Sequence, residues 1–270
     1  MWASARHNRQ TLAGQAASSA QQASLLADDE TARVDATIDD LERKFGRALY
    51  HSNADDAGFP PSLSALYAED RPQQLFALGN LALLAESGVG ICGSRDASSR
   101  ALDIAGEVVG MLAHEGQVIV SGYARGVDQI AHAAALDAGG KTIIVLPEGL
   151  ARFSIRKDLR SLWDWERILV VSQFSLQTPW KSWNAMRRNR TIMGLSRAML
   201  VVEAKSNGGT FDAGKVALAY RKPVFAVDFS DIDEARSGNR ILIDEGAMPL
   251  KRDRISGAPN IRPIIEAVSN

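Results

Sequence analysis

Two glycine-containing segments carry the residue types of an anion site. Gly93-Ser94-Arg95 combines a glycine, which lets the backbone approach a ligand, with a serine that can cap a helix and an arginine. Ser121-Gly122-Tyr123-Ala124-Arg125-Gly126 repeats the combination. Backbone N–H groups at a helix N-terminus favour a negative charge, and each arginine adds a positive one. Both segments are therefore candidates for binding a phosphate, although an ordinary strand-to-helix turn has the same residue types.

Two further segments have a similar character. Arg187-Arg188-Asn189-Arg190 is a basic cluster shortly before an apolar run, and Gly208-Gly209-Thr210 stands where a helix is expected to begin. A basic cluster is often only a solvated surface, whereas Gly-Gly-Thr at a helix N-terminus can cradle a phosphate. Each segment alone is weak evidence, but four of them at one edge of a sheet would predict an anion site.

A hydrolase triad is the catalytic alternative for the second segment. Ser121, Asp128 and His132 have suitable side chains, but Asp128 and His132 lie one helical turn apart and would pair with each other. The sequence contains no G-x-S-x-G motif. We therefore expect Asp128 to cap a helix and His132 to pack in the core.

The positive charge of the chain is concentrated in one window. The formal net charge is −1, yet residues 151–200 hold ten Lys and Arg against three Asp and Glu. Four of the five tryptophans fall there too: Trp163, Trp165, Trp180 and Trp183. Cations beside aromatic rings suit single-stranded nucleic acid, because the cations contact phosphates and the rings stack on bases. A solvated basic face above core tryptophans is the alternative, and composition slightly favours it.

Alternating apolar runs and helical patterns must position these segments. Helical patterns cover Ala101–Glu115 and Val127–Ala138. The apolar runs lack polar alternation, which predicts strands buried on both faces of a parallel sheet with helices on either side, an α/β fold. Ligands bind such sheets at the carboxyl ends of the strands, where the four segments lie. The runs are Val89–Cys92, Gln117–Val120, Thr142–Leu146, Ile168–Ser172, Met199–Glu203 and Val224–Asp228.

The sequence pattern predicts that the first 57 residues form a separate segment. Residues 1–27 are rich in Ala, Gln and Ser without an apolar period, which predicts disorder or a frayed helix. A helix is expected from Glu30, with Val34, Ile38, Leu41, Phe45 and Ala48 on one face. We predict an N-terminal segment over residues 1–57 and an α/β domain over residues 58–270.

Several classes of protein are excluded by composition. The 270 residues contain no apolar run long enough for a transmembrane helix and no apolar core of a signal peptide at the start. A lone cysteine, Cys92, cannot form an internal disulfide, and the four histidines lack metal-ligand spacing. We expect a cytoplasmic protein without a metal.

Taken together, the segments resemble the DprA/Smf family of bacterial DNA-processing proteins. Phe59-Pro60-Pro61-Ser62-Leu63, Leu75-Phe76-Ala77-Leu78-Gly79-Asn80 and the segments above follow the order of the family motifs, and Gly238-Asn239-Arg240 to Gly246-Ala247 completes the match. The ordered set is far more specific than any single motif. The resemblance implies an extended Rossmann-like, doubly wound domain that binds and protects single-stranded DNA. It also implies a homodimer that helps to load the recombinase RecA, without a cofactor and without catalysis.

The resemblance also implies roles for individual residues. Arg95 would contact a DNA phosphate, with Gly93 and Ser94 lining the pocket. A second basic contact falls on Arg156 or Lys157, near Phe153, whose ring would stack on a base. The family's R-N-R corresponds to Arg188, Asn189 and Arg190. Further candidate phosphate contacts are Ser121, Gly122, Arg125, Gly126, Gly208, Gly209 and Thr210.

The chain also departs from the family pattern. Ala151, Ser154, Ile155 and Asp158 replace characteristic residues around the second basic contact, and the segment from Asn207 to Ala213 differs as well. We expect a divergent member without the C-terminal winged-helix module that many members carry. A role in natural transformation does not follow automatically from the resemblance.

A second resemblance supplies the alternative functions. Met186 to Val202 with Gly208-Gly209-Thr210 is similar to the LOG phosphoribohydrolases, whose glutamate stabilises charge on a ribosyl centre. Here Ala213 stands at the position of that glutamate, and Asp212 is one residue short of it. Hydrolysis of a nucleoside monophosphate is therefore disfavoured. A nucleotide sensor of the same fold remains open.

Overall fold

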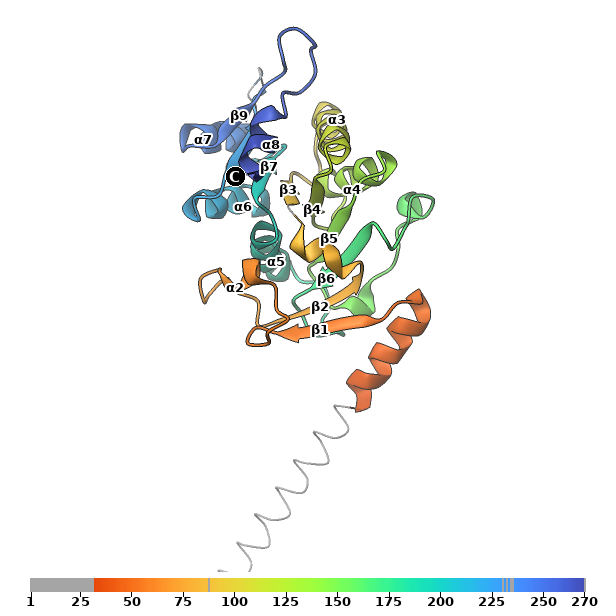
Figure 1. Cartoon of the computed structure of the whole chain (residues 1–270). Helices are drawn as coiled ribbons and strands as arrows, with labels where there is room; N and C mark the ends of the chain where they lie inside the picture. Colours follow the sequence, from red (N-terminus) through yellow and green to blue (C-terminus); the bar gives the residue numbers. More distant parts are fainter. Residues whose placement is uncertain (1–31, 87, 230, 232, 234–235, 270) are drawn as a thin grey trace, which may run out of the picture. The chain divides into compact units, whose positions relative to one another are not determined.

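The structure, a computed structural model, describes residues 32–269 except residues 87, 230, 232, 234 and 235 (Figure 1). The chain divides into two units after Arg47. In the first unit, residues 32–45 are helical, as expected from the apolar spacing there. The predicted start of this helix at Glu30 and the predicted disorder of residues 1–27 lie outside the described residues.

The second unit is built on a nine-stranded sheet in the order β1-β2-β6-β5-β4-β3-β7-β8-β9 (Figure 1). Strand β2 pairs antiparallel with β1 and with β6. All other neighbouring strands, from β6 through β5, β4, β3, β7 and β8 to β9, pair in parallel. The strands are β1 (Leu49–Asn53), β2 (Gln74–Gly79), β3 (Gly88–Cys92), β4 (Val118–Ser121), β5 (Thr142–Leu146), β6 (Ile168–Ser172), β7 (Ala198–Val201), β8 (Val224–Val227) and β9 (Met248–Leu250).

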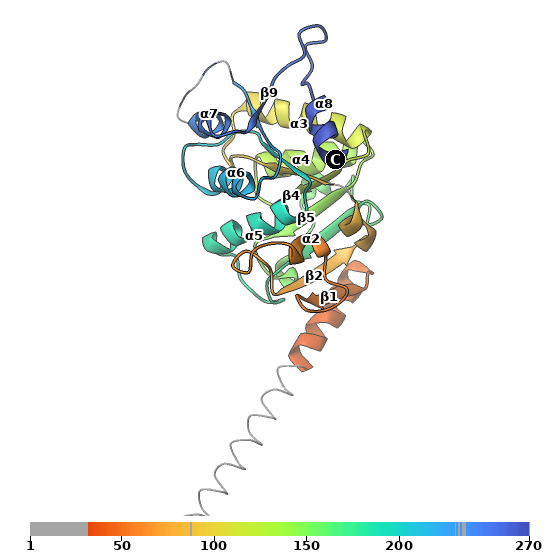
Figure 2. The same ribbon diagram turned by 60° about the vertical axis from the view of Figure 1, so that its left-hand side comes forward.

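Helices cover both faces of this sheet, as Figures 1 and 2 show. One apolar core joins the sheet to α2 (Pro61–Ser64), α5 (Ser182–Gly194), α6 (Gly209–Ala219) and α7 (Ser237–Asp244). The other core joins it to α3 (Ser99–His114), α4 (Val127–Asp137) and α8 (Arg262–Ser269). Strands β3 to β8 are buried along their whole length, because helices exclude water from both sides. The predicted doubly wound, mostly parallel α/β fold is confirmed.

The order of the strands reverses between β3 and β7. From β3 the chain winds through β4 and β5 to β6, then crosses back by α5 to β7 on the other side of β3. Loops at the carboxyl ends of two strands that diverge in this way leave a crevice between them, and open α/β sheets bind ligands there. The crevice between β3 and β7 is therefore where a ligand is expected.

Strand β1 lies before the predicted boundary at residue 57 and pairs with β2 along Leu49–Asn53. The structure therefore places the sheet's first strand inside the segment that the sequence assigned to the N-terminal region. Both apolar cores of the second unit are made of residues from Ala54 onward. Whether the N-terminal segment is separable stays a prediction, and its test is given below.

Candidate nucleic-acid interface

A cavity of about 380 Å³ occupies the crevice between β3 and β7. Its walls come from the loops that follow β3, β4 and β7 and from the first three turns of α5. All four predicted segments reach it: Gly93, Ser94 and Arg95 after β3, Ala124 after β4, Arg188 and Asn189 on α5, and Gly209 and Thr210 at the start of α6. The topology thus brings together residues that are more than 100 positions apart in the sequence.

A second cavity of about 310 Å³ adjoins the first and shares Arg95, Ala124 and Arg188 with it. Arg125, Arg156 and Trp180 also line this second cavity. Glu148 lines it too, and burial raises the pKa of its carboxyl group, with Arg152 opposing the shift. Together the two cavities form one site, called here the basic groove.

The loop after β3 sets the position of Arg95. The Ser94 N–H donates to the Glu203 carbonyl oxygen at 2.9 Å, which ties the loop to the end of β7. A Cβ atom on Gly93 would lie 2.4 Å from Val127, so close packing of α4 requires a glycine there. Ser98, rather than Ser94, caps α3 by accepting a hydrogen bond from the Ala101 N–H at 3.2 Å.

Arg95 itself is exposed, and its guanidinium lies 5.4 Å from the centre of the Trp180 ring. Within the described part of the chain, no carboxylate lies within 4.0 Å of its side chain. The two carboxylates that could have neutralised it are engaged: Asp96 pairs with Arg125 at 2.6 Å, and Asp128 pairs with Arg188 at 3.6 Å. Arg95 therefore presents an unneutralised positive charge at the junction of the two cavities.

Most of the predicted contact residues in the loop after β4 support the fold and do not line the groove. Ser121 is fully buried and its Oγ donates to the Ile91 carbonyl oxygen at 2.8 Å, so it does not reach the groove. Gly126 has φ +80°, a conformation that favours glycine, and it lines neither cavity. Gly122 also lies outside the two linings. Of this segment's predicted contacts, only Arg125 faces the groove.

The expected pairing of Asp128 with His132 is not found. The Asp128 carboxylate accepts a hydrogen bond from the Ala124 N–H at 3.2 Å and pairs with Arg188. His132 is fully buried, and its ring nitrogens contact Thr142 Oγ1 and the Gly122 carbonyl oxygen. The core position predicted for His132 is confirmed, but its partners come from the ends of β4 and β5.

The three residues of the basic cluster have different environments. Arg188 is only 5% exposed and donates to the Val145 carbonyl oxygen at 3.2 Å, so it forms the floor of the groove. Asn189 Nδ2 donates to the Gly209 carbonyl oxygen at 3.0 Å and joins α5 to α6. Arg190 pairs with Asp70 and Asp212 and lines neither cavity. A DNA contact by Arg190 therefore does not fit its position.

The two candidates for the second basic contact are also distinguished. Arg156 lines the groove, where it donates to the carbonyl oxygens of Tyr123 and Ala124 at 2.8 and 3.1 Å and lies over the Tyr123 ring. Lys157 is exposed but lies outside both linings. Phe153 is 2% exposed and packs against Tyr123 and Trp163. Its predicted stacking on a base is corrected: the ring has no surface to offer.

At α6, Thr210 Oγ1 donates to the Gly93 carbonyl oxygen at 3.1 Å, which links the fourth segment to the first. Gly209 and Thr210 line the cavity, whereas Gly208 does not. The helix N-terminus therefore faces the crevice, as a phosphate cradle requires.

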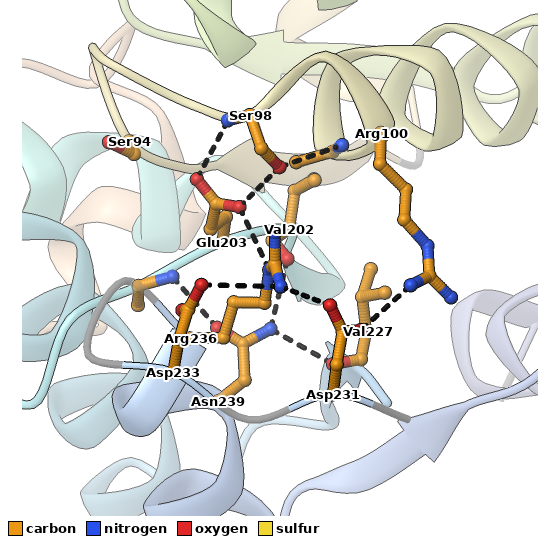
Figure 3. A network of polar contacts seen from close by, with 12 residues as sticks. Ser94, Ser98, Arg100, Val202, Glu203, Val227, Asp231, Asp233, Arg236 and Asn239 are labelled. Atoms are coloured by element: carbon orange, nitrogen blue, oxygen red, sulfur yellow. Dashed lines mark hydrogen bonds and ion pairs between the residues drawn. The ribbon is translucent and has the colours of Figure 1, made fainter. Parts of the chain in front are cut away.

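Glu203 and Lys205 are groove residues that the sequence interpretation did not single out. Both follow β7 at its carboxyl end. Glu203 is almost fully buried and accepts hydrogen bonds from the Ser98 N–H and Oγ at 3.0 and 2.7 Å, and its second carboxylate oxygen also contacts Arg236 (Figure 3). Arg236 in turn pairs with Asp231, which also pairs with Arg100. This network neutralises Glu203 and fixes the N-terminus of α3.

Lys205, in contrast, is exposed, and within the described residues no carboxylate lies within ion-pair distance of its amine. The buried acids of the groove, Asp128 and Glu203, thus have cationic partners, whereas no carboxylate of the described chain pairs with Arg95 or Lys205. Cys92 adds no charge, because burial raises the pKa of its thiol to about 12. The groove therefore has a surplus of positive charge that suits an anion.

Within the described residues, no group of three or more His, Cys, Asp or Glu side chains is arranged to hold a metal ion. No helix there combines the length and the apolar character that crossing a bilayer requires.

The fold and the groove define a Rossmann-like protein with a basic groove at the topological switch point of its sheet. The chain belongs to the DNA recombination-mediator protein A family, known as DprA, whose signature matches residues 51–256. It is 38% identical over 214 residues to the DNA processing protein DprA of Streptococcus pneumoniae, covering 78% of this chain and 74% of that protein. The corresponding protein of Bacillus subtilis is 33% identical over 192 residues, covering 70% of this chain and 64% of the relative.

A solved structure with the same fold is that of DNA processing protein A from Helicobacter pylori. It superimposes with a TM-score of 0.66 at 25% identity, covering 81% of this chain and 95% of that one. That H. pylori protein binds single-stranded DNA.

Proposed function

We propose that the basic groove binds single-stranded DNA. The observation that carries this proposal is Arg95, an exposed arginine without a carboxylate partner in the described structure, at the junction of two cavities on the ligand edge of the sheet. The helix N-terminus at Gly209 and the cations Arg156 and Lys205 add further attraction for phosphates. The single-stranded DNA binding of the H. pylori relative supports the same ligand.

Membership of the DprA family extends the proposal to the whole protein. We propose that the chain acts in DNA processing or recombination in the cytoplasm, as a homodimer that protects single-stranded DNA and helps to load a RecA-type recombinase. The matched relatives are described as DNA processing proteins, which supports this role. The chain spans 64% to 74% of their length, so these finer assignments concern the shared region.

The direct test is the affinity for an oligonucleotide of about 20 nucleotides across a salt series, with duplex DNA and mononucleotides as competitors. Replacing Arg95 with alanine should weaken binding about tenfold, because a charge-assisted contact is lost. The slope of log K against log salt should fall by about 0.7, the share of one counterion on a single strand. Thermal stability should barely change, since Arg95 is exposed.

Arg262→Ala is the matched control, because Arg262 is an exposed arginine on α8 whose guanidinium pairs with Glu266 and which lines neither cavity of the groove. It should leave both the affinity and the salt slope unchanged. A loss of melting temperature in Arg95→Ala with an unchanged slope would make Arg95 a structural residue. Tight binding of a mononucleotide without DNA affinity would instead favour the nucleotide sensor.

We also propose that the protein is not a phosphoribohydrolase. Ala213 is buried on α6, and the neighbouring Asp212 is paired with Arg190 outside the groove. The described part of α6 therefore presents to the groove no carboxylate like the one that stabilises a ribosyl cation in the related hydrolases. No base should be released from nucleoside monophosphates in a chromatographic assay. Release that disappears in Asp212→Asn would contradict this and make Asp212 the substitute.

The N-terminal residues should be dispensable for both folding and binding. Because both apolar cores of the second unit begin at Ala54, removing residues 1–27 deletes none of their side chains. The shortened protein should keep the melting temperature and the DNA affinity of the full chain, as measured by thermal unfolding and titration. An insoluble product, or one that no longer binds, would show that the segment belongs to the functional domain.

A further inference from the structure

Three large apolar side chains at the start of α5 are exposed beside the basic groove. Trp180 is 48% exposed, Trp183 58% and Met186 45%. Trp183 and Met186 are three positions apart on the helix and so share one face, while Trp180 precedes the first turn. These three residues are called here the indole patch. Large apolar groups gathered on a surface indicate a contact with another molecule.

The four tryptophans of residues 151–200 fall into two pairs with different surroundings. Trp163 and Trp165 pack edge to face with ring centres 5.1 Å apart, and Trp163 contacts Phe153. These two rings stabilise the loop that joins β5 to β6. Trp180 and Trp183 lie outside that cluster, so packing within the protein does not account for them. The sequence offered core tryptophans and a nucleic-acid groove as alternatives; Trp163 and Trp165 are half-buried in an aromatic cluster outside the two apolar cores, and Trp180 and Trp183 are exposed.

The patch is continuous with the groove. Trp180 lines one of its cavities and Met186 lines the other. The guanidinium of Arg95 lies 5.4 Å from the Trp180 ring centre, and the amine of Lys181 lies 4.9 Å from the Trp183 ring centre. Neither cation has a carboxylate partner within ion-pair distance among the described residues. Each exposed ring thus has a cation beside it that a phosphate can still engage.

We propose that the indole patch stacks the unpaired bases of single-stranded DNA, while Arg95 and Lys181 contact the phosphates next to the stacked bases. The alternation of ring and cation matches the alternation of base and phosphate along a strand. Stacking on aromatic rings tolerates every base, because every base has a π-face. This inference rests on the proposed function and assigns to Trp180 and Trp183 the role that Phe153, being buried, cannot fill.

A second copy of the chain is the competing occupant, since tryptophan and methionine are also enriched at protein interfaces. The cations over both rings and the continuity with a basic groove favour the nucleic acid. A dimer through this face would bring two positive surfaces together, which costs free energy. The test below separates the two occupants.

The experiment compares a 20-nucleotide oligothymidylate with an abasic oligonucleotide of the same length, which has the phosphates but no bases. The wild-type protein should bind oligothymidylate more tightly. Trp180→Ala and Trp183→Ala should each weaken binding of oligothymidylate at least about fivefold and leave binding of the abasic strand unchanged. Trp180→Phe should retain most of the affinity, since a ring remains. The salt slope should stay that of the wild type in all three variants.

The outcomes distinguish this inference from the proposed function. If the alanine variants bind both strands as the wild type does, the stacking role fails while DNA binding by the groove stands. If the wild type binds neither strand, the proposed function fails and this inference with it. Conversion of a dimer to a monomer in Trp183→Ala by sedimentation, without a base-dependent loss of affinity, would overturn the inference in favour of an interface between copies.

Discussion

Replacing Arg188 with methionine should destabilise the protein by about 3–5 kcal/mol in urea unfolding. The guanidinium is 5% exposed and lies 3.6 Å from the equally buried carboxylate of Asp128. Burial lowers the pKa of Arg188, and the Asp128 charge opposes that shift. Without the arginine, Asp128 stays buried without its charged partner, and the Val145 carbonyl oxygen loses its donor at 3.2 Å. The loss of stability therefore comes from leaving the Asp128 carboxylate and the Val145 carbonyl oxygen buried without a partner, not from the interaction energy of the ion pair itself.

A second substitution separates these contributions. Asp128→Asn in the Arg188→Met background removes the stranded charge, so the double variant should recover a large part of the lost stability. Arg187→Met is the matched control, because Arg187 is the neighbouring arginine on α5 and is exposed. That variant should change the free energy of unfolding by no more than about 0.5 kcal/mol.

The same variants decide whether Arg188 has a direct role in binding. A side chain at Gly122 would overlap with the Arg188 guanidinium, which shows how closely the protein encloses it. We therefore expect any weakening of DNA binding in Arg188→Met to follow the loss of folded protein. An Arg188→Met protein as stable as Arg187→Met but unable to bind DNA would make Arg188 a ligand contact, as the sequence first indicated.

The parallel part of the fold was predictable from the sequence for a simple physical reason. Strands buried on both faces need apolar residues at successive positions, and such runs are visible without knowledge of the partners. Strand β1, Leu49–Asn53, was missed because its burial is mixed and its residues are largely polar. Strand β9, Met248–Leu250, was missed because it has three residues and a central proline. The sequence also predicted that the four glycine-rich or basic segments lie together, because loops at the carboxyl ends of parallel strands meet at one edge of the sheet.

The roles of the individual arginines could not be predicted from the sequence. Arg95 is exposed without a carboxylate partner among the described residues, Arg188 is buried with Asp128, and Arg190 is paired with Asp70 and Asp212 outside the groove. Their partners are far away in the sequence: Asp128 is 60 positions from Arg188, and Asp70 is 120 positions from Arg190. Only the fold brings these carboxylates to their arginines. For Glu203 and Lys205 a signal existed, since Glu203 ends the predicted strand Met199–Glu203 and Lys205 follows that strand two positions later, at its carboxyl end.

His132 should make the fold sensitive to mild acid. Burial lowers the pKa of its imidazole from 6.5 to about 4, although the hydrogen bond with the Gly122 carbonyl oxygen raises it. That oxygen can only accept, so Nε2 carries the proton, and Nδ1 faces the Thr142 hydroxyl at 2.7 Å. Thr142 Oγ1 also lies 2.8 Å from the Ile119 carbonyl oxygen. The neutral ring thus joins the loop after β4, which bears Arg125, to the start of β5.

The sign of the pH effect follows from where each state binds the proton. The unfolded chain protonates His132 near pH 6.5, whereas the folded protein resists protonation until about pH 4. Acid therefore favours the unfolded state. Stability should be unaffected by this group above pH 7, fall by about 2 kcal/mol by pH 5 and lose about 3 kcal/mol below pH 4. The free energy of unfolding measured in urea between pH 7 and pH 5 tests this before most carboxylates titrate.

The test compares how steeply the free energy of unfolding changes with pH in each protein. Its absolute value at one pH is not enough, because removing His132 also removes its hydrogen bonds. His132→Gln should be less stable than the wild type at pH 7, but its free energy of unfolding should change much less between pH 7 and pH 5. His114→Gln provides the control, since His114 is exposed at the end of α3 and should leave the slope of the wild type intact. If His132→Gln kept the full slope, the imidazole would not be the group that resists the proton, and the acid sensitivity would have to come from the carboxylates.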